Sequence, residues 1–289
     1  MTTTVTLTGT GVPHPSPGRA GAGTLVRYGD LALQFDAGRG TVLRLSEAGV
    51  PVQEVTATFL THVHSDHLVG LPDLAMTRWV MQHHHGCGPL TVVSPEGACA
   101  DFVRTMLQPY AADIAVRVEH VQPEPPTVDL FTYPVPDRPT TVWTSEDEAV
   151  RVDAVAVHHE PVEGAVAYRV TTPTAVVVIS GDTRVCAEVE DLARGADVLV
   201  HEACRRTAMR DVIAGTAYEH IFDYHADTVA LGGLAARADV GHLVLTHLIP
   251  PPRHDREIAG FADDVRSGGY DGPLTVGADL FTVSVSSRL

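Results

Sequence analysis

Residues 61–67 read T-H-V-H-S-D-H and directly follow an apolar, β-branched run that is typical of a strand. At such a strand end, side chains two residues apart point the same way, so His62 and His64 can bind one ion. Asp66 and His67 lie beyond the strand, where the turning backbone can aim them at a second ion. Neutral imidazoles with a carboxylate suit zinc, and two neighbouring ions are a common hydrolytic device. This stretch therefore predicts a two-metal hydrolytic site.

The chain as a whole has the composition of one folded domain. Its 289 residues contain no linker, low-complexity tract or composition break, and 44% of them are apolar, which is enough for a sizeable core. We therefore expect a single domain over 1–289, with an irregular, proline-rich excursion at about 122–148. The first residues lack a basic and an apolar signal region, and no run approaches the ~18 apolar residues of a membrane span. We expect a soluble, cytoplasmic protein with no membrane partner.

Charge and cysteine usage narrow the classes of partner. The formal net charge is −16, whereas a nucleic-acid-binding protein normally presents a basic face to phosphates. This balance disfavours a nucleic-acid substrate without excluding it. The four cysteines form no C-x-x-C pair, so we expect reduced core thiols rather than a zinc ribbon or redox site.

The order of apolar runs predicts an α/β fold in which two sheets pack together with helices outside. Each half of the chain contains strands and helices without strict alternation. Strands are expected at 5–8, 24–28, 31–36, 56–60, 151–157, 164–171, 174–180, 198–201, 242–246, 274–276 and 280–284. Helices are expected at 41–48, 71–81, 95–107, 185–194 and 226–238.

Further residues of metal-ligand type follow other apolar strands. Sites built from the ends of several strands are how α/β folds assemble catalysis. A single histidine at a strand end is usually unremarkable, but several beside a first cluster indicate one shared site. They are His159 after 152–157, Asp182 after 175–180, His201 and Glu202 after 198–200, and His247 after 243–246.

These motifs together resemble the metallo-β-lactamase fold superfamily of binuclear hydrolases, whose members are four-layer αββα sandwiches. The resemblance rests on H-V-H-S-D-H at 62–67, His159, S-G-D-T at 180–183 and L-T-H at 245–247, in the family's order. It implies that one ion is held by His62, His64 and His159, the other by Asp66, His67 and His247, with Asp182 bridging both. His158 competes with His159 for the third position. His159 fits better, because the run after it resembles the family's H-x-P-V and A-Y-R pattern.

A finer resemblance is to the ribonuclease Z and arylsulfatase-like branch. It rests on Gly9-Thr-Gly-Val-Pro13, on His201-Glu-Ala203, on His225 after an aromatic loop, and on L-T-H-L-I-P at 245–250. In that branch Glu202 would orient His225, which would protonate the leaving oxygen; a carboxylate partner makes histidine a competent general acid. Otherwise His225 only precedes the helix expected at 226–238.

Two departures separate this chain from the tRNA-processing members. His159 and Asp182 are only 23 residues apart, and two strands fill that gap, so the tRNA-clamping arm has no room there. The residues after His247 include Pro250-Pro-Pro-Arg253, where those members tend to have S-P-R-Y. Both departures move the expected substrate from tRNA towards a small molecule.

The sequence thus predicts a metal-dependent hydrolase that cleaves a small phosphodiester, sulfate ester or related ester through a metal-bridging hydroxide, with Asp66 orienting the nucleophile. The alternatives are a ribonuclease Z-type endonuclease that processes tRNA 3′ ends, and a lactonase or glyoxalase II-like thioesterase. A di-iron redox relative is disfavoured by His64, where such relatives usually carry glutamate. Zinc is the ion expected first, although the same donors accept manganese, iron or cobalt. A homodimer is common among relatives, and the role of His83–His85, substrate contact or plain surface, stays open.

Overall fold

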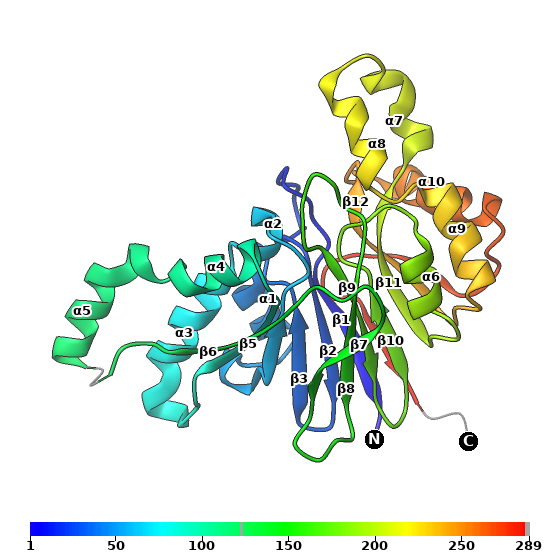
Figure 1. Ribbon diagram of the computed structural model, residues 1–289. Helices are drawn as coiled ribbons and strands as arrows, with labels where there is room; N and C mark the ends of the chain where they lie inside the picture. The colour runs from blue at the N-terminus through cyan, green and yellow to red at the C-terminus, as the bar shows by residue number, and fades with distance from the viewer. Residues whose placement is uncertain (122–123, 287–289) are drawn as a thin grey trace.

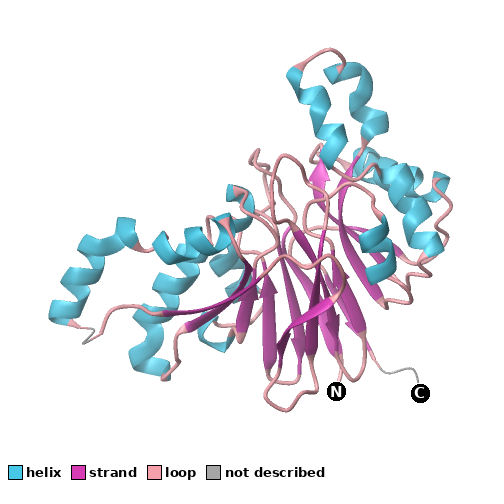
Figure 2. Cartoon of the chain, viewed as in Figure 1, coloured by secondary structure: helices cyan, strands magenta, loops and turns pink. Residues whose placement is uncertain are grey.

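The protein is built on two seven-stranded sheets that pack face to face (Figures 1 and 2). The computed structural model describes residues 1–121 and 124–286, and only the backbone of 83–85. The first sheet has the order β14 (Thr282–Val285), β1 (Thr3–Gly9), β2 (Gly23–Tyr28), β3 (Leu31–Phe35), β4 (Ala57–Phe59), β5 (Leu90–Pro95) and β6 (Val128–Tyr133). The second has the order β13 (Leu274–Val276), β12 (Leu243–Ile249), β11 (Val198–Cys204), β10 (Val176–Ile179), β9 (Val166–Thr171), β8 (Arg151–Ala156) and β7 (Thr140–Thr144).

Helices cover the outer face of each sheet. The first sheet is followed by α1 (Thr41–Glu47), α2 (Ser65–Leu68), α3 (Leu71–His85), α4 (Ala98–Thr105) and α5 (Ala111–His120), with short 3-10 turns η1 (Val52–Glu54) and η2 (Gln108–Tyr110). The second carries α6 (Ala187–Leu192), α9 (Thr228–Arg237) and α10 (Asp255–Ser267), whereas α7 (Arg206–Ile213), η3 (Ala217–His220) and α8 (Ile221–Tyr224) project from the end of the sandwich (Figure 1). The expected αββα sandwich is confirmed.

The core between the sheets is aromatic and aliphatic. The rings of Phe35 and Phe59 stack at 4.8 Å between centroids, and Tyr168 from the opposite sheet lies 5.4 Å and 5.7 Å from them. Strand β10 is buried on both faces, because Val177 and Ile179 face this core while Val178 faces the helices behind. That arrangement explains the nearly unbroken apolar run at 175–180, since a strand buried on both sides has no polar alternation.

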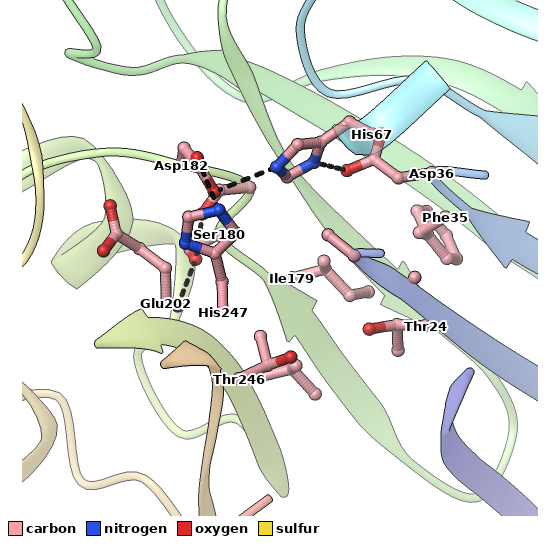
Figure 3. A pocket seen from close by; sticks show the side chains of 14 residues that line it. Thr24, Phe35, Asp36, His67, Ile179, Ser180, Asp182, Glu202, Thr246 and His247 are labelled. Carbon is pink, nitrogen blue, oxygen red and sulfur yellow. Dashed lines mark hydrogen bonds and ion pairs between the residues drawn. The ribbon is translucent and has the colours of Figure 1, made fainter. Parts of the chain in front are cut away.

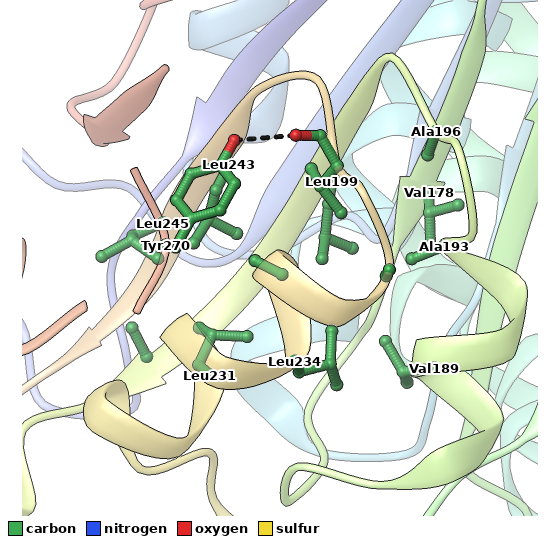
Figure 4. Close-up of a cluster of buried hydrophobic side chains, with 14 of the residues drawn as sticks. Val178, Val189, Ala193, Ala196, Leu199, Leu231, Leu234, Leu243, Leu245 and Tyr270 are labelled. Carbon is green, nitrogen blue, oxygen red and sulfur yellow. Dashed lines mark hydrogen bonds between the residues drawn. The ribbon is translucent and has the colours of Figure 1, made fainter. Parts of the chain in front are cut away.

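The outer layers bury separate clusters. Leu231 and Leu234 of α9 pack on Leu199 and Leu243 of the second sheet (Figure 4). A corresponding cluster lies between the first sheet and α1, α3 and α4, with Leu45, Leu71 and Leu74 fully buried.

Several expected elements differ from those observed. The segment 122–148 is less irregular than expected, because β6 and β7 form edge strands there; its prolines at 134, 136 and 139 lie between the two strands, where no ladder N–H is needed. Residues 122–123 lie outside the described residues. Strand β5 and the helices α2, α5, α7, α8 and α10 were not expected from the sequence. The four cysteines are free thiols; Cys99 and Cys204 are buried, as expected of core thiols, whereas Cys87 and Cys186 are only partly buried. Among the described helices, none has the length and apolar character needed to span a bilayer.

The direction of the parallel strands places the candidate site residues at one edge of the sandwich. Strands β3, β4 and β5 run parallel in the first sheet, and β10, β11 and β12 run parallel in the second. The carboxyl ends of β3, β10, β11 and β12 line one shared depression. Most of the ligand-type residues that follow the strands in sequence are therefore neighbours in space.

Candidate metal centre

The histidine-rich stretch forms a strand end and one helical turn. His62 lies just beyond β4, His64 has an extended backbone and caps α2, and Asp66 and His67 belong to that short helix. The backbone N–H of His67 donates to the His64 carbonyl at 3.1 Å. This change from strand to helix gives the four side chains directions that neither element alone would provide.

Asp182 stands at the centre of two groups of donor atoms. One group contains His62, His64, His159 and Asp182, and its donor atoms lie within 4.8 Å of one another. Asp66, His67 and His247 form a second group, whose donor atoms also lie within 4.8 Å of one another. His67 and His247 each place Nε2 3.3 Å from a carboxylate oxygen of Asp182 (Figure 3). The seven residues predicted as ligands are thus brought together, and the structure places Asp182 between the two groups.

His158 lies outside both groups. Its ring nitrogens approach the carboxylates of Glu160 and Glu188, at 3.3 Å and 3.2 Å, and its side chain is 35% exposed. His159, by contrast, is buried and its Nε2 lies 3.1 Å from Nδ1 of His64. The geometry therefore favours His159 over His158 as the donor.

The turn that carries Asp182 requires a glycine before it. Gly181 has φ of 60°, and a Cβ there would lie 2.8 Å from the Cβ of Thr61. Only glycine adopts this left-handed backbone at no steric cost while allowing such a close approach. The S-G-D-T sequence is thus explained by the contact between this turn and the strand end at Thr61.

His247 is presented by a bulge rather than by a strand end. It lies inside β12, where Thr246 pairs with Glu202 and Leu248 with Ala203, so His247 is the extra residue. Its φ is 42°, and the bulge aims the ring at Asp66, with Nε2 3.2 Å from the carboxylate. Bulges redirect a side chain at the cost of one unpaired ladder position.

Outer partners fix the rings of three histidines. Asp36, at the end of β3, accepts from Nδ1 of His67 at 2.7 Å and from the backbone and hydroxyl of Thr61 at 2.8 Å and 2.7 Å. The carbonyl of Tyr224 accepts from Nδ1 of His159 at 3.1 Å, and Thr61 Oγ1 lies 3.0 Å from Nδ1 of His62. Such partners set which ring nitrogen faces an ion. Asp36 was not predicted as a site residue, although it follows an apolar strand as the other site residues do.

Electrostatics within the two groups favour a bound cation. Burial, followed by repulsion from His67, holds the pKa of His62 well below its ordinary value, so the ring stays neutral as a ligand must. Burial would favour the acid form of Asp182, but His247 and His67 keep its pKa well below the ordinary range. Burial also opposes a charge on His67, yet Asp182 and Asp36 raise its pKa well above 6.5. The carboxylates around His67 thus favour a positive charge at this position.

Glu202 and His225 form a buried pair beside these groups. Nδ1 of His225 lies 2.8 Å from Oε1 of Glu202, and the two side chains are 10% and 1% exposed. Burial of the ring is outweighed by the carboxylate, which raises the pKa of His225 to about 9. The other ring nitrogen can approach Asp182 and His247, since the three residues also form a group within 4.8 Å. His201, next in the strand, points to the opposite face and belongs to neither group.

The amino-terminal loop packs against the backbone of Asp66, a member of the second donor group. Asp279 accepts from the N–H and hydroxyl of Thr10, from the N–H of Ala20 and from Nε of Arg44, at 2.6–3.0 Å. The loop then packs so tightly that a Cβ on Gly21 would lie 2.7 Å from the Asp66 carbonyl. The G-T-G-V-P motif at 9–13 thus belongs to a loop that supports Asp66. Sequence reasoning missed Asp279, which is far from the other site residues in the chain.

Other predicted positions differ in location or remain undescribed. His83–His85 form the last residues of α3, and their side chains lie outside the described residues. Tyr224 contacts the His159 ring edge-on at 5.4 Å, consistent with the aromatic loop expected before His225.

Comparison with known proteins agrees with this geometry. Residues 34–248 match the family described as the β-lactamase superfamily domain. The chain belongs to the metallo-β-lactamase superfamily. A protein named Ribonuclease Z from Mycobacterium marinum is 36% identical over 292 residues, covering 98% of this chain and 99% of that one. The expected class, a metallo-hydrolase, is therefore confirmed.

Solved structures show the same fold. The metallo-β-lactamase fold protein YhfI from Bacillus subtilis superimposes with a TM-score of 0.75 at 20% identity, covering 98% of this chain and all of the other. The short form of human tRNase Z superimposes with a TM-score of 0.69 at 22% identity, covering 98% and 99%. At such identities the likeness concerns the fold alone.

Proposed function

We propose that this superfamily member is a two-metal phosphodiesterase that cleaves RNA as a ribonuclease Z-type endonuclease, at the 3′ ends of tRNA precursors. The observation that carries the proposal is the two neighbouring donor groups, with Asp182 of the first lying 3.3 Å from His67 and His247 of the second, and the Glu202–His225 pair beside them. That arrangement provides two cation-binding sites and one general acid, which together can hydrolyse a phosphodiester.

The donor atoms fit two divalent ions. Nε2 of His62 is buried with no hydrogen-bond partner among the described residues, and the buried Nε2 of His67 and Oδ1 of Asp182 have only their mutual contact at 3.3 Å within hydrogen-bond distance. Such atoms are costly unless something else binds them. Imidazole and carboxylate donors suit zinc first, and manganese or iron second.

Each residue then has a role. His62, His64 and His159 would hold one ion, Asp66, His67 and His247 the other, and Asp182 both. The ions, when bound, supply an activated water nucleophile at neutral pH and neutralise charge on the attacked phosphate. Asp66 would bind its ion through one carboxylate oxygen, which leaves the other to orient the nucleophile.

His225 would act as the general acid. Its Nδ1 is held by Glu202, so the proton on Nε2 is the one directed towards the metal groups. A raised pKa keeps the ring protonated near neutral pH, and proton transfer to the leaving oxygen is worth about 10²- to 10⁴-fold in rate. Glu202 stabilises the charged ring without contacting the substrate.

The choice of RNA over a small ester reverses the preference that sequence features alone gave. The alignment with the M. marinum relative spans 292 positions and nearly all of both chains, so that relative has no long arm that this chain lacks. The short interval between His159 and Asp182 therefore does not set this chain apart from relatives named Ribonuclease Z. The twenty basic residues are all arginines, whose guanidinium groups bind phosphate in bidentate geometry.

A small phosphodiester remains the second candidate, favoured by the net charge of −16. A direct test compares cleavage of a tRNA precursor with a panel of chromogenic phosphodiester, phosphotriester, sulfate, lactone, thioester and β-lactam substrates on metal-quantified protein. We expect a single cut at the 3′ side of the acceptor stem, at a kcat/KM well above that for any panel member. A panel substrate that is turned over efficiently while the precursor stays intact would refute the RNA proposal and leave the metal centre in place.

A further inference from the structure

A helical hairpin rises from the end of the sandwich beside the metal centre (Figures 1 and 2). It consists of α7, η3 and α8, and it joins the end of β11 to the start of α9. Within residues 206–220, all of them described, every residue is exposed or only partly buried. The hairpin therefore has no core of its own, and its orientation depends on how its two legs are tied at the base.

Asp264 of α10 ties both legs. Its Oδ2 accepts from Nε of Arg205 at 3.1 Å and from the hydroxyl of Thr207 at 2.5 Å, both on the rising leg. The same oxygen accepts from the hydroxyl of Thr228, on the returning leg, at 2.9 Å. Asp264 is only 9% exposed, so these bonds are made where water competes weakly.

The surrounding contacts support this junction. The N–H of Cys204 donates to the carbonyl of Ala226 at 2.7 Å, which pairs the two legs directly. The Arg205 guanidinium lies 5.7 Å from the centre of the Phe261 ring and fills a space that a side chain at Gly260 would take, since a Cβ there would lie 2.3 Å from it. Arg205, although cationic, is thus built into the base of the hairpin.

The returning leg carries two groups that lie at the site, the carbonyl of Tyr224 and the ring of His225. The carbonyl of Tyr224 accepts from Nδ1 of His159, and the next residue, His225, is held by Glu202. His225 is separated from Thr228 by only two residues. Any shift of the leg at Thr228 would therefore move His225 relative to Asp182 and His247.

We propose that Asp264 is a positioning residue, which sets the reach of His225 by clamping both legs of the hairpin. It contacts neither the metal donor groups nor the substrate. The inference rests on the proposed role of His225 as general acid, because without that role the position of the ring would not affect leaving-group departure.

The test uses the full chain loaded with zinc and two substrates that differ in leaving group. Bis(4-nitrophenyl) phosphate releases an acidic phenol that departs without help, whereas diphenyl phosphate needs protonation. We expect Asp264→Asn to lower kcat on diphenyl phosphate about tenfold or more beyond any loss on the nitrophenyl ester, because small misplacements of a catalytic group are costly. The zinc content per chain should stay that of the unaltered protein.

Two further variants control for folding and charge. Asp263→Asn makes the same charge change on the neighbouring, exposed residue of α10 and should leave both rates unchanged. Thr207→Val removes one bond to Asp264 from an exposed position, so it should fold and show a smaller selective loss. Equal losses on both substrates, or no loss, would overturn the positioning role.

His225→Ala separates this proposal from the one on which it rests. With His225 absent, Asp264→Asn should add no further leaving-group effect. If His225→Ala itself leaves the two substrates equally affected, the acid role fails whatever Asp264 does. If His225→Ala is selective and Asp264→Asn is not, the acid role stands and the clamp is refuted.

Discussion

Replacing Glu202 by glutamine should move the alkaline limit of activity to lower pH. Glu202 is fully buried, and its Oε1 lies 2.8 Å from Nδ1 of His225. Glutamine keeps the shape and an acceptor oxygen, which can still receive the N–H of Thr183, but it removes the negative charge. Burial then acts on the ring without its counterion and returns the pKa of His225 towards or below 6.5.

The size of the effect follows from the pKa of about 9 that the unaltered ring has. A general acid must be protonated to act, so activity is present below this pKa and is lost as pH rises through it. At about pH 8, roughly nine-tenths of a ring with a pKa of about 9 is protonated, against roughly one in thirty at a pKa of 6.5. We therefore expect about a thirtyfold loss at this pH and little loss at about pH 6.

The assay is kcat/KM against pH for diphenyl phosphate, with metal content measured in each sample. Both proteins carry the same ions, so the displacement between their alkaline limbs reports the charge of Glu202. Bis(4-nitrophenyl) phosphate serves as the reference that needs no acid. Superimposable alkaline limbs for the two proteins would refute the reasoning, as would an equal displacement on the reference substrate.

Three other substitutions probe the support of the site. Asp36→Ala removes the acceptor for Nδ1 of His67 and should weaken zinc binding about 10- to 100-fold in chelator competition; unchanged affinity would contradict its orienting role. Asp279→Ala leaves buried N–H groups of the amino-terminal loop unpaired, and urea unfolding should show a loss of at least about 2 kcal/mol, whereas a loss below about 0.5 kcal/mol would mean that the loop is held otherwise. Phe59→Ala opens a cavity between the sheets and should lower the free energy of unfolding by about 3–5 kcal/mol. A change in this free energy close to zero would refute that expectation.

The strand ends were predictable because the site repeats one pattern. Each apolar run ends in a polar residue, and parallel strands bring such ends to one edge, so His62, His159 and Asp182 could be placed without coordinates. Asp36 follows the same pattern but was not predicted as a site residue. His247 was expected just after a strand but lies inside β12, at a bulge. A bulge depends on the pairing of two strands that are far apart in sequence, so local sequence does not predict it.

The hairpin and the substrate were harder for physical reasons. Helix α7 carries apolar residues with helical spacing at Met209, Val212 and Ile213, but the hairpin buries none of them fully, so its place on the sandwich could not be inferred. Helix α10 also carries that spacing at Ile258, Phe261 and Val265 and could have been predicted. The preference against RNA rested on the short interval after His159, on Pro250-Pro-Pro-Arg253 and on net charge. Net charge sums over the whole surface and does not describe the surroundings of the site.

Metal stoichiometry tests the central claim most directly. After equilibration with zinc and removal of the excess, the unaltered protein should retain two ions per chain by elemental analysis, because two donor groups meet at Asp182. Asp182→Ala should retain fewer than one and lose phosphodiesterase activity together with the metal. A single ion in the unaltered protein, or two ions retained by Asp182→Ala, would contradict the two-metal centre.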